Sequence, residues 1–378
     1  MKSAFVMCTG CEQRDLDAER VRMYLRKNGF DIVSRPERAD LVILVTCAVD
    51  ERNERESLAV LKSVANAKPA SGRLLVGGCL PSISPEAVRA VADATFSPRT
   101  LESLDGLLED DVRVPMAQIP DPNCAAGAPP VRSFGWKARA RAEYELAKRG
   151  YTIRINHGCL ASCSYCVIRF ATGRLESVAM ESIAESFESA LARGEATIML
   201  VGGDTGAYGL DIGTDFVSLL DRLLQYEGHH RIYIHDFNAN WLLRSLQGFV
   251  RVLESAHGRL RAASIPVQSG SDRVLKRMRR SYRVGDVVAA LNLVRETAPD
   301  LLLGSHVIVG FPGETEEDFL ETMYFLEKVE FDFITCFRYS EHPAAPSARY
   351  DGKVPEEEKH SRLARLSGLL GDSAVILT

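Results

Sequence analysis

The first part of the chain alternates short apolar runs with longer amphipathic stretches. Residues 4–7, 41–46 and 73–76 have the length and composition of buried strands, and residues 15–28 and 51–67 have the periodicity of helices. Strands that alternate with helical segments are typical of βαβ units, in which the strands pair in parallel. The pattern therefore predicts an amino-terminal α/β domain built on a parallel sheet.

The same alternation returns after residue 150 in a longer series. The predicted strands, with helical segments between them, cover residues 152–156, 197–201, 231–235, 262–267, 302–309 and 333–339. Six strand–helix units are too few for a closed eightfold barrel, so we expect an open, partial (β/α)6 barrel. Its active face should lie at the carboxyl ends of the strands.

A connection rich in Pro, Gly and Ala separates the two patterns. It covers residues 117–135, and this composition is typical of an exposed linker. The length of 378 residues also favours two domains. We predict an amino-terminal domain over residues 1–120, a linker over residues 121–140 and a barrel domain over residues 141–378.

Composition narrows the class of protein. The chain has 46 Lys plus Arg against 51 Asp plus Glu, a net charge of -5, so any RNA contact would have to come from a local patch. We find neither a signal peptide nor an apolar run long enough to span a membrane, which predicts a cytoplasmic protein with no membrane partner. In a reducing compartment, its nine cysteines are expected to be metal ligands or free thiols.

Three cysteines lie close together directly after the first strand of the predicted barrel. Cys159, Cys163 and Cys166 have the spacing CxxxCxxC. A zinc site would usually show a fourth Cys or His nearby, whereas three thiolates on one loop suit a 4Fe-4S cube with one iron free of protein ligands. A zinc knuckle or a plain cluster of thiols remains the alternative.

Another three cysteines follow strands of the amino-terminal domain. Cys11, Cys47 and Cys79 each come just past one predicted strand. The carboxyl ends of parallel strands open into one crevice, so these thiols could converge although they are distant in sequence. Three unrelated buried thiols would be the simpler interpretation.

Further motifs follow successive strands of the barrel. Gly202, Gly203 and Asp204 come after the second strand, and their glycines would let the backbone approach a ligand while the carboxylate accepts from an ammonium group. The segments at residues 266–272 and 309–315 come after the fourth and fifth strands.

Together these motifs resemble the radical S-adenosylmethionine methylthiotransferases. The resemblance rests on the following segments: Thr9-Gly10-Cys11, Val45-Thr46-Cys47, Gly77-Gly78-Cys79-Leu80, the CxxxCxxC loop, Gly202-Gly203-Asp204, Pro266-Val267-Gln268-Ser269-Gly270-Ser271-Asp272 and Val309-Gly310-Phe311-Pro312-Gly313-Glu314-Thr315. Arg14 departs from the pattern, because the family usually has Asn there.

The resemblance implies two 4Fe-4S clusters and S-adenosylmethionine as cofactors. Cys159, Cys163 and Cys166 would hold the catalytic cluster, which generates a 5'-deoxyadenosyl radical, and Cys11, Cys47 and Cys79 would hold a second cluster that carries sulfur. The residues expected to bind S-adenosylmethionine are Tyr165, beside the adenine, and Gly202, Gly203, Asp204, Gln268, Ser269, Val309, Gly310 and Phe311.

The implied reaction converts an unactivated C–H bond into C–SCH3. A low-potential electron donor, such as flavodoxin or ferredoxin, would supply the electron. Family members usually continue into a carboxyl-terminal β-barrel that binds RNA, but only residues 371–378 follow the last predicted helix here. Either the chain is truncated or it recognises its substrate differently. Because the net acidic chain has no basic module in place of that domain, we favour the second, with a ribosomally made peptide or protein as substrate. A tRNA adenosine methylthiotransferase is the alternative enzyme, and a non-catalytic iron–sulfur sensor or electron carrier is the alternative from another class.

A basic run follows the fourth barrel strand. It contains six cations with Asp272 as the only nearby acid: Arg273, Lys276, Arg277, Arg279, Arg280 and Arg283. The run could meet phosphate or an acidic peptide, one member could bind the carboxylate of S-adenosylmethionine, or the whole run could be a solvated helix face.

Overall fold

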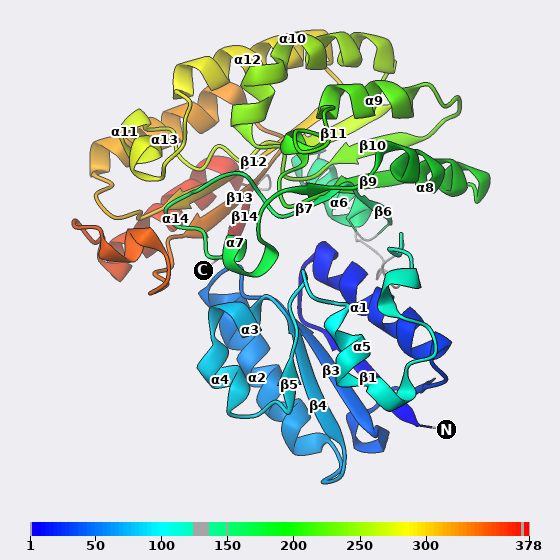
Figure 1. The fold of residues 1–378 in the computed structure, drawn as a ribbon. Helices are drawn as coiled ribbons and strands as arrows, with labels where there is room; N and C mark the ends of the chain where they lie inside the picture. Colours follow the sequence, from blue (N-terminus) through cyan, green and yellow to red (C-terminus); the bar gives the residue numbers. More distant parts are fainter. Residues whose placement is uncertain (1, 124–135, 149, 372–373, 378) are drawn as a thin grey trace. The chain divides into compact units, whose positions relative to one another are not determined.

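The computed structural model describes residues 2–123, 136–148, 150–371 and 374–377. Most of the predicted linker therefore lies outside the described residues. The chain forms two compact units (Figure 1): one comprises Met1–Ala125 with Val167–Arg174, and the other comprises Ala126–Cys166 with Leu175–Thr378.

The first unit is built on a parallel sheet with the strand order β2-β1-β3-β4-β5. The strands are β1 (Ser3–Cys8), β2 (Asp31–Ile32), β3 (Leu41–Thr46), β4 (Arg73–Gly78) and β5 (Ala94–Thr95). All six residues of β3 are buried, as expected for a central strand covered on both faces. The predicted amino-terminal α/β domain is confirmed.

Helices cover both faces of this sheet. They are α1 (Glu12–Lys27), α2 (Glu51–Ala67), α3 (Leu80–Ile83), α4 (Pro85–Arg89) and α5 (Ser103–Leu107). Figure 1 shows α1 and α5 on one face and α2, α3 and α4 on the other. A further short helix, α7 (Ile168–Thr172), packs against α3 and belongs to this unit, although it directly follows the cysteine loop of the other.

The second unit contains a seven-stranded sheet with the order β14-β13-β12-β11-β10-β9-β6, and all of its pairs are parallel. The strands are β6 (Tyr151–Arg154), β9 (Thr197–Val201), β10 (Arg231–Ile234), β11 (Leu260–Ser264), β12 (Leu302–Val309), β13 (Phe333–Arg338) and β14 (Ala374–Leu377). The predicted partial barrel is thus confirmed, with one strand more than expected. The additional strand, β14, uses the free hydrogen-bonding edge of β13.

The first predicted barrel strand is divided. After β6, the chain leaves the sheet, and β7 (Asn156–His157) pairs antiparallel with β8 (Glu176–Ser177). This departure starts the loop that carries the three clustered cysteines.

Helices follow the strands of the barrel and share one apolar core with the sheet. They are α8 (Met180–Ala192), α9 (Phe216–Leu224), α10 (Ala239–Ala256), α11 (Asp272–Arg277), α12 (Val284–Thr297), α13 (Glu316–Val329) and α14 (Glu356–Leu370). A further helix, α6 (Trp136–Ala147), precedes β6 and contacts β9 and β13. The core positions Phe187, Leu220, Phe249, Leu291 and Phe325 come from five different helices. Within the described ranges, the helices are too short or too polar to cross a membrane.

Candidate active site

The barrel cysteines lie on the loop between β7 and α7. Cys163 is 8% exposed, and Cys159 and Cys166 are partly exposed. The amide of Ala161 donates to the Cys159 sulfur at 3.3 Å. Burial raises the pKa of the Cys159 thiol to about 12, and the carboxylate of Asp204 and the other two thiols add to this shift. The three thiols therefore interact within one site.

The segment after β9 comes into very close contact with this loop. A Cβ atom on Gly203 would lie 1.9 Å from the carbonyl oxygen of Gly158, and one on Gly202 would lie 2.3 Å from Oδ1 of Asn156. Only glycine permits these approaches. The Asn156 amide also donates to the carbonyl of Asp204 at 2.9 Å, which holds the two segments together.

The Asp204 carboxylate is buried, and only one of its two oxygen atoms accepts hydrogen bonds among the described residues. Its Oδ2 atom accepts from Trp241 Nε1 at 2.7 Å and from Asn238 Nδ2 at 3.4 Å, whereas Oδ1 is buried without a hydrogen-bond partner among the described residues. Burial raises the pKa of Asp204 to about 6, and the hydrogen bond from Trp241 opposes this. The free oxygen can accept from a ligand cation.

Arg280 supplies a positive charge near this carboxylate. Arg280 interacts electrostatically with Asp204, Cys163 and Tyr165, and its guanidinium lies 6.0 Å from the centre of the Tyr165 ring. The Arg280 Nε atom is buried and has no hydrogen-bond partner in the described part of the chain. A lone acceptor and a lone donor of opposite charge suit the zwitterionic amino acid end of a ligand such as S-adenosylmethionine.

Sequence reasoning missed Trp241 and Asn238. Both lie at the start of α10, just past the carboxyl end of β10. Their place at the carboxyl end of a barrel strand, where active-site residues usually lie, was the signal that could have identified them.

The aromatic side chain of the cysteine loop packs against an apolar cluster. Tyr165 contacts a group that also includes Phe311: Val274, Met278, Ile308, Phe311 and Tyr339. The structure thereby brings together two residues predicted to bind S-adenosylmethionine.

The motif after β11 bridges to β12. Gln268 has a φ of 79°, its amide donates to His306 O at 2.8 Å, and its carbonyl accepts from the Ile308 amide at 2.9 Å. Ser269 is fully buried, and its hydroxyl group lies 3.3 Å from that of Thr322. These contacts stabilise the loop, and they orient the Ser269 hydroxyl toward α13.

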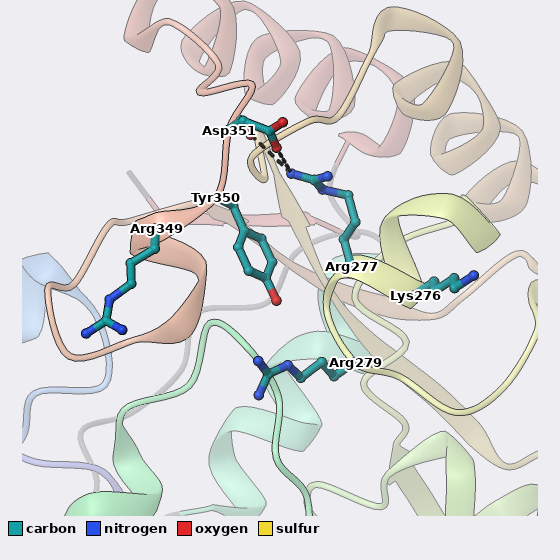
Figure 2. A pocket seen from close by; sticks show the side chains of 6 residues that line it. All are labelled: Lys276, Arg277, Arg279, Arg349, Tyr350 and Asp351. Atoms are coloured by element: carbon teal, nitrogen blue, oxygen red, sulfur yellow. Dashed lines mark hydrogen bonds and ion pairs between the residues drawn. The ribbon is translucent and has the colours of Figure 1, made fainter.

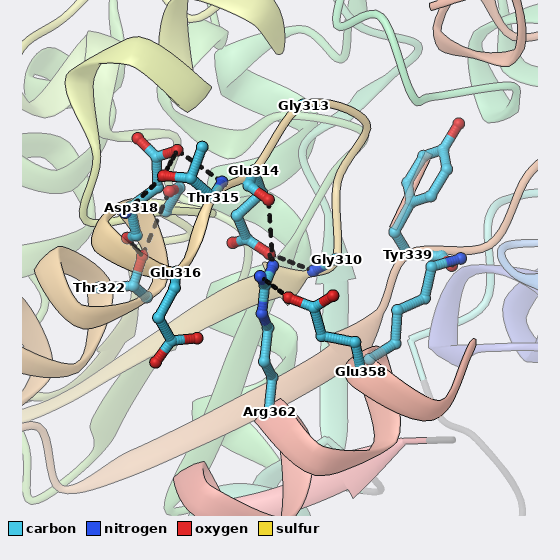
Figure 3. Close-up of polar contacts among 12 residues, drawn as sticks. Gly310, Gly313, Glu314, Thr315, Glu316, Asp318, Thr322, Tyr339, Glu358 and Arg362 are labelled. Carbon is cyan, nitrogen blue, oxygen red and sulfur yellow. Dashed lines mark hydrogen bonds and ion pairs between the residues drawn. The ribbon is translucent and has the colours of Figure 1, made fainter. Parts of the chain in front are cut away.

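The loop after β12 is held by buried polar contacts (Figure 3). The amide of Gly310 and the guanidinium of Arg362 both bond the Glu314 carboxylate, and the ion pair measures 2.6 Å between side chains that are 1% and 0% exposed. Thr315 then begins α13 with a capping box to Asp318. Val309 is fully buried and accepts from the Tyr339 amide at 2.8 Å.

The other three cysteines lie at the carboxyl ends of strands in the first unit. Cys47 and Cys79 are buried and directly follow β3 and β4, while the exposed Cys11 precedes α1. Interaction with the Cys47 thiol lowers the pKa of Cys11 to about 6, and the same interaction raises the pKa of Cys47. Burial raises the pKa of Cys79 to about 11, with a contribution from Cys11. The three thiols therefore lie close enough together to shift one another's pKa values.

Arg14 supplies a buried positive charge to this group. Its Nη1 atom lies 3.5 Å from the Cys79 sulfur, and its Nε atom forms an ion pair with Asp17 at 2.9 Å. Burial alone would lower the pKa of Arg14, but Asp17 and the thiols raise it. The departure from the family's usual Asn thus places a cation beside candidate thiolates.

Neither set forms a ready-made site for one metal ion. In the part of the chain that the structure describes, no three His, Cys, Asp or Glu side chains are arranged to hold one. The ligands of a 4Fe-4S cube bind separate iron atoms, so each set is a candidate for a cube on its shared interactions and thiol chemistry.

Two family models match the chain in separate regions. The Radical SAM superfamily matches residues 153–326, and "Uncharacterized protein family UPF0004" matches residues 3–96. Over 382 residues, the chain is 32% identical to tRNA-2-methylthio-N(6)-dimethylallyladenosine synthase of Desulfosudis oleivorans, an alignment that covers 97% of this chain and 78% of that protein. The chain belongs to the radical S-adenosylmethionine methylthiotransferase family.

A second relative of this methylthiotransferase is the threonylcarbamoyladenosine tRNA methylthiotransferase MtaB of Thermotoga maritima. The two are 29% identical over 376 residues, which cover 96% of this chain and 80% of that protein. Among solved structures, the radical S-adenosylmethionine methyltransferase TsrM of Kitasatospora setae has a TM-score of 0.62 at 17% identity, over 92% of this chain and 77% of that one. This likeness supports the fold.

The predicted enzyme class is confirmed, and membership implies a 4Fe-4S cluster and S-adenosylmethionine. The predicted preference for a peptide or protein substrate is wrong, because the named relatives are tRNA-modifying enzymes. Net charge misled that prediction, since recognition of RNA depends on local patches and not on the charge of the whole chain. The alternative of a non-catalytic iron–sulfur sensor or electron carrier is also excluded, because the chain belongs to a family of enzymes.

Proposed function

We propose that this methylthiotransferase replaces a C–H bond of a tRNA adenosine with C–SCH3. The observation that carries the proposal is the similarity, over nearly the whole chain, to relatives named for methylthiolated tRNA adenosines. The presence of two converging cysteine sets in one chain supports it, because the reaction needs both a radical and a source of sulfur.

We propose that each cysteine set holds one 4Fe-4S cluster. Cys159, Cys163 and Cys166 would hold the catalytic cluster, and Cys11, Cys47 and Cys79 would hold the second. When bound, these clusters and S-adenosylmethionine supply the electron transfer and the methylthio group that side chains cannot provide.

The chain's own residues would bind and orient the cofactor. Asp204 Oδ1 would accept from the ammonium group of S-adenosylmethionine, Arg280 would bind its carboxylate, and Tyr165 would lie along the adenine. The other proposed contacts come from residues at the strand ends: Gly202, Gly203, Gln268, Ser269, Val309, Gly310 and Phe311. A flavodoxin or ferredoxin as electron donor and a cytoplasmic location stay predictions.

Modification of tRNA by the reconstituted chain tests the proposal. The substrate is tRNA from a strain without methylthiotransferases, supplied with S-adenosylmethionine and dithionite. We expect an adenosine whose mass has increased by one methylthio group less one hydrogen, detected by mass spectrometry of digested nucleosides. Turnover of S-adenosylmethionine without any modified nucleoside in the tRNA pool would contradict the proposed substrate.

A further inference from the structure

A basic pocket lies on the barrel unit beside the cysteine loop (Figure 2). Its volume is about 430 Å³, and it is lined by Lys276, Arg277, Arg279, Arg349, Tyr350 and Asp351. Four cations thus face one acid. The lining comes from two segments that are distant in sequence, the end of α11 and the loop after β13.

One of these cations builds the pocket wall. Arg277 forms an ion pair with Asp351 at 2.8 Å, donates to the carbonyl of Pro312 at 2.9 Å and lies 5.2 Å from the centre of the Tyr350 ring. Its charge is therefore compensated within the protein.

The other three cations are uncompensated. Within the described ranges, the side chains of Lys276, Arg279 and Arg349 form no ion pair and no hydrogen bond, and all three are exposed. Arg279 has a φ of 61°, which is uncommon for a non-glycine residue. This turn lets Arg279 line the pocket while its neighbour Arg280 lies beside Tyr165. Neighbouring members of the basic run therefore face different sites: Arg279 lines the pocket, and Arg280 lies in the candidate active site.

Ser164 connects the pocket to the cysteine loop. Its hydroxyl group donates to the Arg277 carbonyl at 2.8 Å, and its amide donates to the Met278 carbonyl at 3.1 Å. Its own carbonyl accepts from the Ser347 amide at 2.9 Å. Both walls of the pocket are therefore hydrogen-bonded to the residue that follows Cys163.

We propose that this pocket binds one nucleotide of the RNA substrate, with its phosphate at Lys276, Arg279 and Arg349 and its base stacked on Tyr350. The inference rests on the proposed function as a tRNA enzyme. A single-stranded nucleotide presents an anion next to a flat aromatic surface, which matches a group of cations around a partly exposed tyrosine ring.

The size of the pocket favours a nucleotide over an acidic protein. Its volume lies within the range of about 300–1,000 Å³ that is usual for small ligands. A docking protein would instead need a far broader surface. The link through Ser164 would hold the bound nucleotide at a constant place relative to the catalytic loop.

Charge reversal tests the phosphate contacts in the reconstituted full chain. The variant Lys276→Glu/Arg349→Glu should bind tRNA roughly tenfold more weakly, and the dependence of affinity on salt should decrease by about one phosphate contact. With dithionite as reductant, KM for tRNA should rise while kcat is retained. The matched control is Arg193→Glu/Arg251→Glu, which changes the net charge equally at exposed positions and should leave tRNA affinity unchanged.

A second pair of variants tests base stacking. Tyr350→Leu should weaken tRNA binding by roughly tenfold, whereas Tyr350→Phe should retain it. An effect of charge reversal without an effect of Tyr350→Leu would overturn the nucleotide assignment. Iron content and thermal unfolding of each variant report whether it has folded.

Three other results would overturn the inference. Equal tRNA affinity and salt dependence for wild type and the charge-reversed variant, while wild type methylthiolates tRNA, would leave the proposed function standing without this pocket. If the charge-reversed variant kept its tRNA affinity but turned over more slowly than wild type only when reduced flavodoxin replaced dithionite, the pocket would be assigned to an acidic protein. Wild type that neither binds nor modifies tRNA would instead show that the proposed function has failed, and the inference with it.

Discussion

Arg280 and Asp204 present opposite charges to the same site, and each has one buried polar atom without a hydrogen-bond partner among the described residues. If they bind the two charged ends of an amino acid, Arg280→Met should weaken binding of S-adenosylmethionine by about tenfold or more, because a hydrogen bond to a charged group contributes about 1.5–3 kcal/mol. Equilibrium binding to the reconstituted chain measures this effect.

The neighbouring Arg283 provides the control for that substitution. It is exposed at the start of α12, so Arg283→Met should leave the affinity for S-adenosylmethionine unchanged. Arg280→Met with normal affinity would assign the guanidinium to packing against Tyr165 and Tyr282 and not to ligand binding.

Asp318 gives a prediction for the dependence of stability on pH. Burial raises its pKa, but hydrogen bonds from Arg273, Ser271 and Thr315 outweigh burial and hold the pKa at about 2. Since this is below the unfolded value of about 3.9, the unfolded chain binds the proton more tightly. The stabilisation is therefore present above about pH 4 and is lost as the pH falls toward 2.

Urea unfolding of the cluster-free chain and of Asp318→Asn measures this contribution. The difference between their free energies of unfolding should be largest above about pH 4 and should shrink toward pH 2. A difference that stays constant across this interval would show that the Asp318 carboxylate does not carry the effect.

At the scale of elements, the site depends on how closely the end of β9 approaches the loop after β7. Gly203→Ala would force the Gly158 carbonyl, next to Cys159, to move, because a Cβ would lie 1.9 Å from its oxygen. Misplacement of a catalytic group by about 1 Å can lower the rate by about a hundredfold. We expect such a fall in 5'-deoxyadenosine formation, together with loss of iron from the barrel site.

Gly285→Ala is the matched control for that change. Gly285 lies in α12, and a Cβ there meets no atom within 4 Å. This variant should keep its iron and its activity. It should gain less than the roughly 0.5–1 kcal/mol of stability that alanine adds in the middle of a helix, because Gly285 lies in the first turn. Full iron content and activity in Gly203→Ala would instead show that the end of β9 can move away from the loop after β7 without loss of function.

At the scale of the whole molecule, two cubes predict about eight irons per chain after anaerobic reconstitution. Replacing Cys11, Cys47 and Cys79 by Ala should leave about four irons and should retain 5'-deoxyadenosine formation, but should abolish the methylthiolated product. Replacing Cys159, Cys163 and Cys166 should abolish 5'-deoxyadenosine. Iron analysis and product chromatography distinguish these outcomes. Methylthiolation at the unmodified rate by the first variant would exclude its three cysteines as ligands of a sulfur-carrying cluster.

The sequence by itself determined the kind of fold and the family. The buried runs of β3 and β12 and the helical periodicity between strands are local properties, so they could be read without coordinates. The motif cysteines and glycines were equally visible, because a short loop requires particular residues at particular spacings. Charge and chain length carried no such local information about the substrate, and the prediction drawn from them was wrong.

Only the tertiary structure decided which distant residues meet. Trp241 on α10 reaches Asp204 after β9, and Ser164 joins the Arg277 and Ser347 segments, through contacts that no sequence spacing encodes. The members of the basic run are likewise assigned to different partners by the turn at Arg279 and not by their order. The edge strand β14 was missed for a related reason: four residues become a strand there because β13 offers an unpaired edge, which is a property of the folded sheet.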